Sequence, residues 1–402
     1  MTFIIGLISR SSMETFNVKA ARSLKCILCS VFLMQMVMGI VSITTPIYAA
    51  SLGASQLLLG VIGAAGGLIY SFMPFAMGII SDKIRRRIPI IGSMLLYGVS
   101  CIIYILISEP LMLVPIKAIE LLATAMFWPS IEAMLVEVDG RAVEETLRRF
   151  NLSWSSAAII GPVIGGMLIS LCGAKSSFIL SSAVSLTLAI TSSILVIEPL
   201  KEVKRQKLDH PRLKGADLNQ IVMAVAAILL FSFILGIIFN LFPAHAVLLG
   251  IPAYEAGIAI FINGLARFLT FSEAYRVEEK IGKIKMFIIG STAMVFASAI
   301  AMISSTTITF SVAFAIYGFG AGILYAASIS LIMRWASHAK GYGAGLFESL
   351  IGVGYLTGSL SGGAVAEYIA INAPYMLSLI LSMVISMSYF TLYIRSSKNT
   401  VS

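Results

Sequence analysis

Five charged side chains lie inside long apolar stretches of this sequence, where an isolated charge is unfavourable. They are three acids and two cations: Glu120, Glu132, Glu348, Lys117 and Arg267. An ionisable group in apolar surroundings must be paired or hydrated, so each of the five is a candidate functional residue. A carboxyl group shielded from water binds a proton more readily than an exposed one, and a guanidinium holds anionic groups. These residue types therefore predict proton exchange and charge pairing.

Each of these groups also has a purely structural interpretation. Arg267 either lines a cavity, where it meets an anionic group or a coupling acid, or braces the bundle through a buried carboxylate. Asn263 lies one helical turn before Arg267 on the same face. Glu348 and Glu132 are either interfacial acids or carboxylates that exchange protons as a cavity opens and closes.

Lys117 and Glu120 are three residues apart, so they can pair on one helix face. Lys117 can also extend towards the membrane surface by itself. Further candidates for a substrate or coupling site are polar or aromatic residues within apolar stretches, namely Gln35, Asn240, Trp128, Tyr325, Trp154, Tyr70 and Tyr317.

The elements that position these residues are membrane-spanning helices. The chain has 402 residues, of which 58% are hydrophobic and only 12% charged, and its mean hydropathy is +0.97. Runs of about 20 apolar residues are long enough to cross a bilayer. Twelve such spans are predicted, at 25–49, 56–80, 88–107, 110–136, 149–172, 176–197, 219–246, 255–275, 286–304, 306–333, 342–369 and 373–394. Arg267 is about 18 Å along its span at helical rise, close to the membrane midplane.

The net charge is +9, and the positions of the basic residues predict the orientation of the chain in the membrane. With Met1 placed in the cytoplasm, 25 of the 28 Lys and Arg residues fall in the termini and in alternate loops on that side. This asymmetry follows the positive-inside rule and predicts two cytoplasmic termini. The basic groups would contact anionic lipid head groups, and a nucleic-acid partner is not expected.

The sequence repeats itself at a constant offset of 197 residues. The offset relates glycines and charged residues along most of each half, for example Gly39 to Gly236, Gly60 to Gly257 and Asp82 to Glu279. Two halves with an even number of spans share one orientation, so an axis along the membrane normal should relate them. The predicted segments are an N-terminal arm (1–24), a six-helix bundle (25–197), a linker (198–218), a second six-helix bundle (219–395) and a tail (396–402).

Two local motifs resemble signatures of the major facilitator superfamily. The loop after the second span resembles the cytoplasmic loop signature of the family. The matching residues are Gly78, Asp82, Lys83, Arg86 and Arg87, and a degenerate copy in the second half contains Glu279 and Lys280. The resemblance implies a conformational latch between the halves. The fifth span resembles the antiporter signature, and the eleventh repeats it, through Ala157, Gly161, Pro162, Gly165, Gly166, Gly354, Gly358, Gly362 and Gly363. Small residues four apart allow close helix packing.

This resemblance implies an all-α membrane protein with two pseudo-symmetric six-helix halves, close to the drug:proton antiporter branch. The implied function is proton-coupled export of small amphipathic or cationic organic compounds by alternating access, in the plasma membrane and as a monomer. Gln35 stands in the first span, where many antiporters of this kind place an acid. A sugar or metabolite uniporter or symporter is the alternative, and a non-transporting receptor a remote one.

Neither ATP nor a metal is expected as a cofactor, and the proton gradient would drive transport. The sequence has no phosphate-binding glycine loop, and its three histidines are widely spaced. The protein is not expected to be an enzyme, because no nucleophile or metal constellation is evident.

Overall fold

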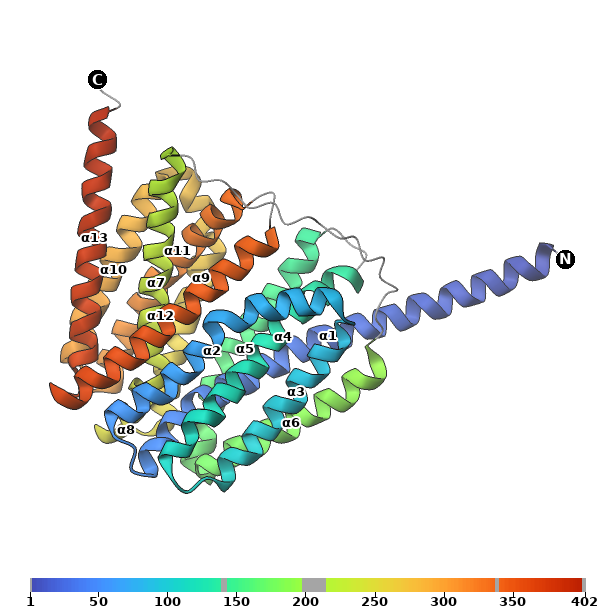
Figure 1. Cartoon of the computed structure of the whole chain (residues 1–402), viewed down its shortest axis with the longest axis horizontal. Coiled ribbons are helices and arrows are strands. Elements are labelled where there is room, and N and C mark those ends of the chain that lie inside the picture. The colour runs from blue at the N-terminus through green and yellow to red at the C-terminus, as the bar shows by residue number, and fades with distance from the viewer. Residues whose placement is uncertain (1, 139–142, 197–214, 337–339, 400–402) are drawn as a thin grey trace.

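The computed structural model describes residues 2–138, 143–196, 215–336 and 340–399, and it is helical almost throughout (Figure 1). The helices are α1 (Thr2–Ser51), α2 (Gln56–Lys83), α3 (Arg87–Leu106), η1 (Pro110–Met112), α4 (Leu113–Val138), α5 (Val143–Cys172), α6 (Ala174–Leu195), α7 (Gly215–Asn240), α8 (Phe242–Leu248), α9 (Ala253–Ile281), α10 (Lys283–Ile303), α11 (Thr307–Trp335), α12 (Lys340–Tyr368) and α13 (Ala373–Asn399).

Each of the twelve predicted spans corresponds to helix in the described chain. The seventh is divided between α7 and α8, because Leu241 interrupts the helix just before Pro243, which has no amide hydrogen to donate. The predicted arm (1–24) is the first part of α1, which extends beyond the bundle in Figure 1. Most of the predicted linker (198–218) lies outside the described residues, and α7 already begins within its last part.

Ten helices of the described chain are long and apolar enough to cross a membrane. The helices α9 and α12 are not among these ten. Polar groups such as Asn263 and Arg267 lie within α9, and α12 combines Glu348 with many Gly, Ser and Thr residues. Both helices pack at the junction of the two halves, α9 against α5 and α12 against α2.

The contacts within the two halves repeat at the same offset as the sequence. In the first half α1 packs on α5, and in the second half α7 packs on α12. A Cβ atom on Gly39 would lie 3.0 Å from Pro162, and one on Gly236 would lie 3.0 Å from the amide nitrogen of Ser359. Gly236 is 197 positions after Gly39, and Ser359 is 197 positions after Pro162. The duplication predicted from the sequence is therefore present in the packing.

The two halves meet along α2 with α12 and along α5 with α9. On the side where α1 ends and α2 begins, called the far side below, these two junctions are equivalent. A Cβ atom on Gly60 would lie 2.5 Å from the carbonyl oxygen of Ser359, and one on Gly257 would lie 2.5 Å from that of Pro162. The far side is therefore closed by two backbone contacts of the same tightness.

Towards the opposite side, called the termini side because both chain ends lie there, the two junctions differ. A Cβ atom on Gly67 of α2 would lie 2.7 Å from the Cα atom of Leu356 in α12. At the equivalent position, a Cβ atom on Gly264 of α9 would lie 3.6 Å from the Cα atom of Ile159 in α5. The helices α2 and α12 thus stay in contact while α5 and α9 separate.

Candidate functional site

A cavity of about 440 Å³ occupies the space where α5 and α9 separate. It is lined by Asn151, Leu152, Trp154, Ser155, Ala158, Ile159, Phe231, Gly264, Arg267, Phe268, Phe271, Ser272 and Tyr325. These residues come from α5, α7, α9 and α11, so both halves contribute to the wall. The volume is within the usual range for small-molecule sites.

Arg267 is the charged side chain in this wall. It is half-buried, and among the described residues it forms neither a hydrogen bond nor an ion pair. Its electrostatic partner is the Tyr325 hydroxyl of α11. Of the two interpretations of Arg267, the structure therefore favours the cavity over a brace to a buried carboxylate.

Two carboxylates, one from each half, lie close to the cavity. Glu132 of α4 and Glu348 of α12 interact electrostatically with each other, and both interact with Tyr325. Tyr70 of α2 donates a hydrogen bond of 3.0 Å to Glu348. Glu132 is exposed to solvent, while Glu348 and Tyr70 are half-buried. The structure thus brings both candidate acids together, which the sequence alone did not predict.

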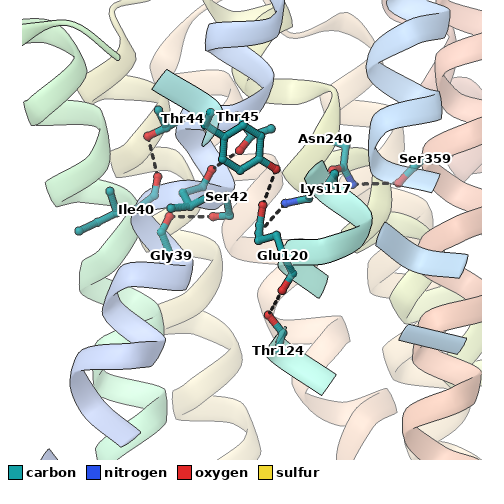
Figure 2. Close-up of polar contacts among 12 residues, drawn as sticks. Gly39, Ile40, Ser42, Thr44, Thr45, Lys117, Glu120, Thr124, Asn240 and Ser359 are labelled. Atoms are coloured by element: carbon teal, nitrogen blue, oxygen red, sulfur yellow. Dashed lines mark hydrogen bonds and ion pairs between the residues drawn. The ribbon is translucent and has the colours of Figure 1, made fainter. Parts of the chain in front are cut away.

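Lys117 and Glu120 form a separate polar cluster near the start of α4, and Figure 2 shows its contacts. The Lys117 Nζ atom is 2.8 Å from a Glu120 carboxylate oxygen, as their spacing predicts, and Tyr104 donates a hydrogen bond of 2.7 Å to the other oxygen. Both charged side chains are 5% exposed. A fully paired, buried cluster of this kind holds α3 and α4 together, and it does not line the cavity.

Asn240 and Asn263 join helices to each other. The Asn240 amide donates to the Ser359 hydroxyl at 2.8 Å, which ties α7 to α12 (Figure 2). Asn263 donates to the Phe314 carbonyl at 3.1 Å and so faces α11. Although Asn263 is one turn from Arg267, its buried side chain makes a packing contact outside the cavity wall.

The remaining candidates lie outside the cavity wall. Gln35 is half-buried on α1 and has no hydrogen bond to the described residues. Trp128 packs edge-on against Phe127 and Phe150. Tyr317 is buried and donates to Ser298.

In the second half, the region of the loop signature contains a cluster of ion pairs. Glu278, at 12% exposure, is 3.1 Å from an Arg334 nitrogen and 3.8 Å from the Lys283 nitrogen, which joins the ends of α9, α10 and α11. The predicted residue Glu279 and its neighbour Lys280 are exposed, and the structure pairs neither with a described residue. Among the described residues, Glu278, one position before Glu279, is the acid that pairs with these cations, and the latch role of Glu279 stays a prediction.

In the first half, the latch residues are only partly described. The side chain of Asp82, the acid of the motif, lies outside the described residues. Lys83 is exposed, Gly78 has open space beside it, and Arg86 is buried where α3 begins, followed by Arg87. The latch role remains a prediction.

The glycine signature is a packing surface on both of its helices. On α5, Gly165 packs on Ile40 of α1, Gly166 packs on Ala253 of α9, and Ala157 is buried. On α12, Gly362 packs on Ile237 and Gly363 on Gly60, while Gly354 and Gly358 face Ser232 and Phe233 of α7. Gly161 and Pro162 pack on Gly39, so the motif sets the contacts between helices rather than the cavity wall.

Several cavity residues were not among the predicted site residues. Phe268 and Phe271 follow Arg267 by one and four positions along α9, and Asn151 and Ser155 are four positions apart on α5; the predicted candidate Trp154 also lines the cavity. Helical spacing around Arg267 could have indicated Phe271, four positions later, but not Phe268, because adjacent residues do not share a helix face. In the described part of the chain, no three His, Cys, Asp or Glu side chains are grouped to hold a metal ion.

The sequence profile of the Major Facilitator Superfamily matches residues 27–275 and 274–401. The chain belongs to this superfamily. It is accordingly a multi-pass membrane transporter rather than an enzyme, with the all-helical fold of the family, and the fold implies a small-molecule substrate.

Individual proteins of the superfamily resemble the chain over most of its length. An uncharacterised transporter of Methanocaldococcus jannaschii is 24% identical over 91% of this chain and 97% of its own length. The staphyloferrin B transporter of Staphylococcus aureus is 26% identical over 80% of this chain and 81% of its own. The crystal structure of the nucleoside transporter NupG superposes with a TM-score of 0.73 at 16% identity, over 92% of this chain and 98% of NupG.

Proposed function

We propose that this superfamily member couples the passage of small organic compounds to the movement of protons by alternating access. The observation that carries the proposal is the pair of carboxylates, Glu132 and Glu348, which belong to different halves, interact electrostatically with each other and both interact with Tyr325 of the cavity wall. Two ionised carboxylates repel each other, and a proton bound to either one removes the repulsion.

Through this repulsion, the protonation state of the two acids influences the conformation of the protein. Because Glu132 and Glu348 belong to different halves, any rocking of the halves changes their separation and hence their interaction. A proton therefore binds with different affinity in different conformations, and a ligand with different affinities shifts a conformational equilibrium. Tyr325 of the cavity wall interacts electrostatically with both acids, which links the occupant of the cavity to the pair.

The proposed direction is export by exchange for protons. The cavity lies in the termini-side half of α5 and α9, and the distribution of basic residues predicts that this side is cytoplasmic. An exporter takes up its substrate there. The antiporter-like glycine motif on α5 supports the same direction. We propose a monomer in the cell membrane, with both termini cytoplasmic and the proton gradient as its energy source.

Flux in proteoliposomes tests the coupling. Purified protein is reconstituted with an internal pH dye, a pH gradient is imposed, and a panel of aromatic acids, lipophilic cations, nucleosides and sugars is added. We expect substrate-dependent proton flux that is lost in Glu132→Gln and Glu348→Gln. Glu109→Gln, which alters an exposed acid just before η1, is the matched control and should retain the flux.

Two outcomes would contradict this proposal. Labelled substrate that moves without proton flux contradicts proton coupling and leaves a uniporter. Flux that persists in both glutamine variants shows that the acid pair is not the coupling site.

A further inference from the structure

We infer that the cavity between α5 and α9 binds organic anions with an aromatic body, with the anionic group held by Arg267. This inference rests on the proposed transport function and names its substrate class. It differs from the expectation of cationic compounds that the resemblance to antiporters gave.

The charge of the cavity wall has one sign. Among the residues that the structure describes, its lining includes Arg267 and no Asp or Glu. Arg267 has no ion pair with a described residue, and its electrostatic interaction is with a neutral phenol, that of Tyr325. The nearby acids Glu132 and Glu348 interact electrostatically with each other, and neither forms an ion pair with Arg267 among the described residues.

An uncompensated cation within the membrane requires a counter-charge or water. The other cation within a span, Lys117, meets this requirement through Glu120 at 2.8 Å (Figure 2). Among the described residues Arg267 has no such partner, and it faces a cavity of small-molecule size. A planar guanidinium offers paired donors that match a carboxylate, sulfonate or phosphate. The missing counter-charge is therefore assigned to the transported compound.

The rest of the wall selects an aromatic body. Five aromatic side chains line the cavity, contributed by Trp154, Phe231, Phe268, Phe271 and Tyr325. Aromatic rings favour flat apolar partners through stacked or edge-on contacts. They also attract cations, but Arg267 is the charged side chain that the described wall presents directly to an occupant, and it repels a cation.

A matched set of ligands tests this inference in the wild-type protein. The probes are 2-naphthoate, 2-naphthamide and 2-naphthylmethylammonium, which share one ring system and differ in charge. Binding to the detergent-purified chain is measured by calorimetry and by quenching of Trp154 fluorescence, with Trp154→Phe as the optical control. We expect naphthoate to bind about tenfold tighter than naphthamide or more, as for hydrogen bonds to a charged group, and the ammonium to bind weakest.

Variants of Arg267 assign the preference to this side chain. In Arg267→Gln, naphthoate affinity should fall to that of naphthamide, whose own affinity stays unchanged and so reports an intact cavity. Arg267→Lys should retain part of the preference for naphthoate, because lysine keeps the positive charge but lacks the paired donors of the guanidinium. Lys175→Gln, which removes an exposed cation at the start of α6, should behave as wild type.

Three results would overturn the inference. These are equal or tighter binding of the amide or ammonium, a preference for naphthoate that persists in Arg267→Gln, and no binding of naphthoate at millimolar concentration. The wild-type series decides the matter even where a variant fails to fold. Since binding needs no gradient, an anion preference without proton flux leaves this inference standing and removes only the coupling proposal.

Discussion

Two equivalent glycines should respond differently to the same substitution, because only one of the two helix junctions is closed. Gly67 of α2 and Gly264 of α9 are 197 positions apart and occupy matching places in the two halves. A methyl group on Gly67 would lie 2.6 Å from the amide nitrogen of Leu356, whereas one on Gly264 would lie no closer than 3.4 Å to Ile159. The first distance requires the helices to move apart, and the second is ordinary contact.

The expected magnitude follows from two contributions. Replacing a helix-interior Gly by Ala favours the helix by up to about 1 kcal/mol, and this contribution is common to both positions. Overpacking a tight contact costs about 1–3 kcal/mol, and it applies only to Gly67→Ala. The free energies of unfolding of the two variants should therefore differ by about 1–3 kcal/mol, with Gly264→Ala at least as stable as wild type.

Thermal unfolding in detergent measures the difference. The midpoints of wild type and both variants are compared at one scan rate, because unfolding of a membrane protein is commonly irreversible. A lower midpoint for Gly67→Ala alone supports the asymmetry. Equal destabilisation of both variants, or a lower midpoint for Gly264→Ala alone, would refute the reasoning that α5 and α9 are separated at this level.

Transport adds a second readout to the same pair. If α5 and α9 close over the cavity as α2 and α12 are closed now, Ile159 must approach Gly264 as Leu356 approaches Gly67. Gly264→Ala should then slow transport while it leaves thermal stability intact. Unchanged transport in this variant would show that α5 and α9 do not close in that way.

Two further substitutions test the polar clusters outside the cavity. Glu120→Gln leaves the buried Lys117 charge without its counter-ion, which should destabilise the protein by about 3–5 kcal/mol; the thermal midpoint measures this, and recovery in Lys117→Met/Glu120→Gln is the control. Asn240→Ala removes the hydrogen bond to Ser359, whose hydroxyl still donates to the Tyr355 carbonyl, so we expect a loss of about 0.5–1.5 kcal/mol. A midpoint equal to wild type for Asn240→Ala would show that α7 and α12 are held together without this bond.

The fold was predictable because its signals are local or repeated along the chain. Span length, the distribution of Lys and Arg, and the 197-residue repeat depend on composition and spacing alone. The pairing of Lys117 with Glu120 was also predictable, since three residues on one helix place both side chains on one face. The position of Glu278 was not, because one residue along a helix turns a side chain by about 100°, and its partners come from α10 and α11.

The site required contacts between distant segments. Glu132 and Glu348 are 216 positions apart, and nothing in the local sequence indicates that they face each other. Asn263 was predicted to share a face with Arg267, but its amide nitrogen donates to the Phe314 carbonyl of α11. Arg267 has no acid partner among the described residues. Whether a polar group is satisfied depends on its neighbours in space, which local patterns do not specify.

The sequence by itself determined that the chain is a duplicated bundle of membrane helices with a few charges inside it, because hydrophobic length and repeat spacing are properties of the chain. Only the tertiary structure decided which charge faces a cavity and which junction is open. The two junctions are equivalent in sequence, so the repeat predicts both equally. The difference between Gly67 and Gly264 arises from how the halves tilt against each other, a choice between similar packings that no single segment encodes.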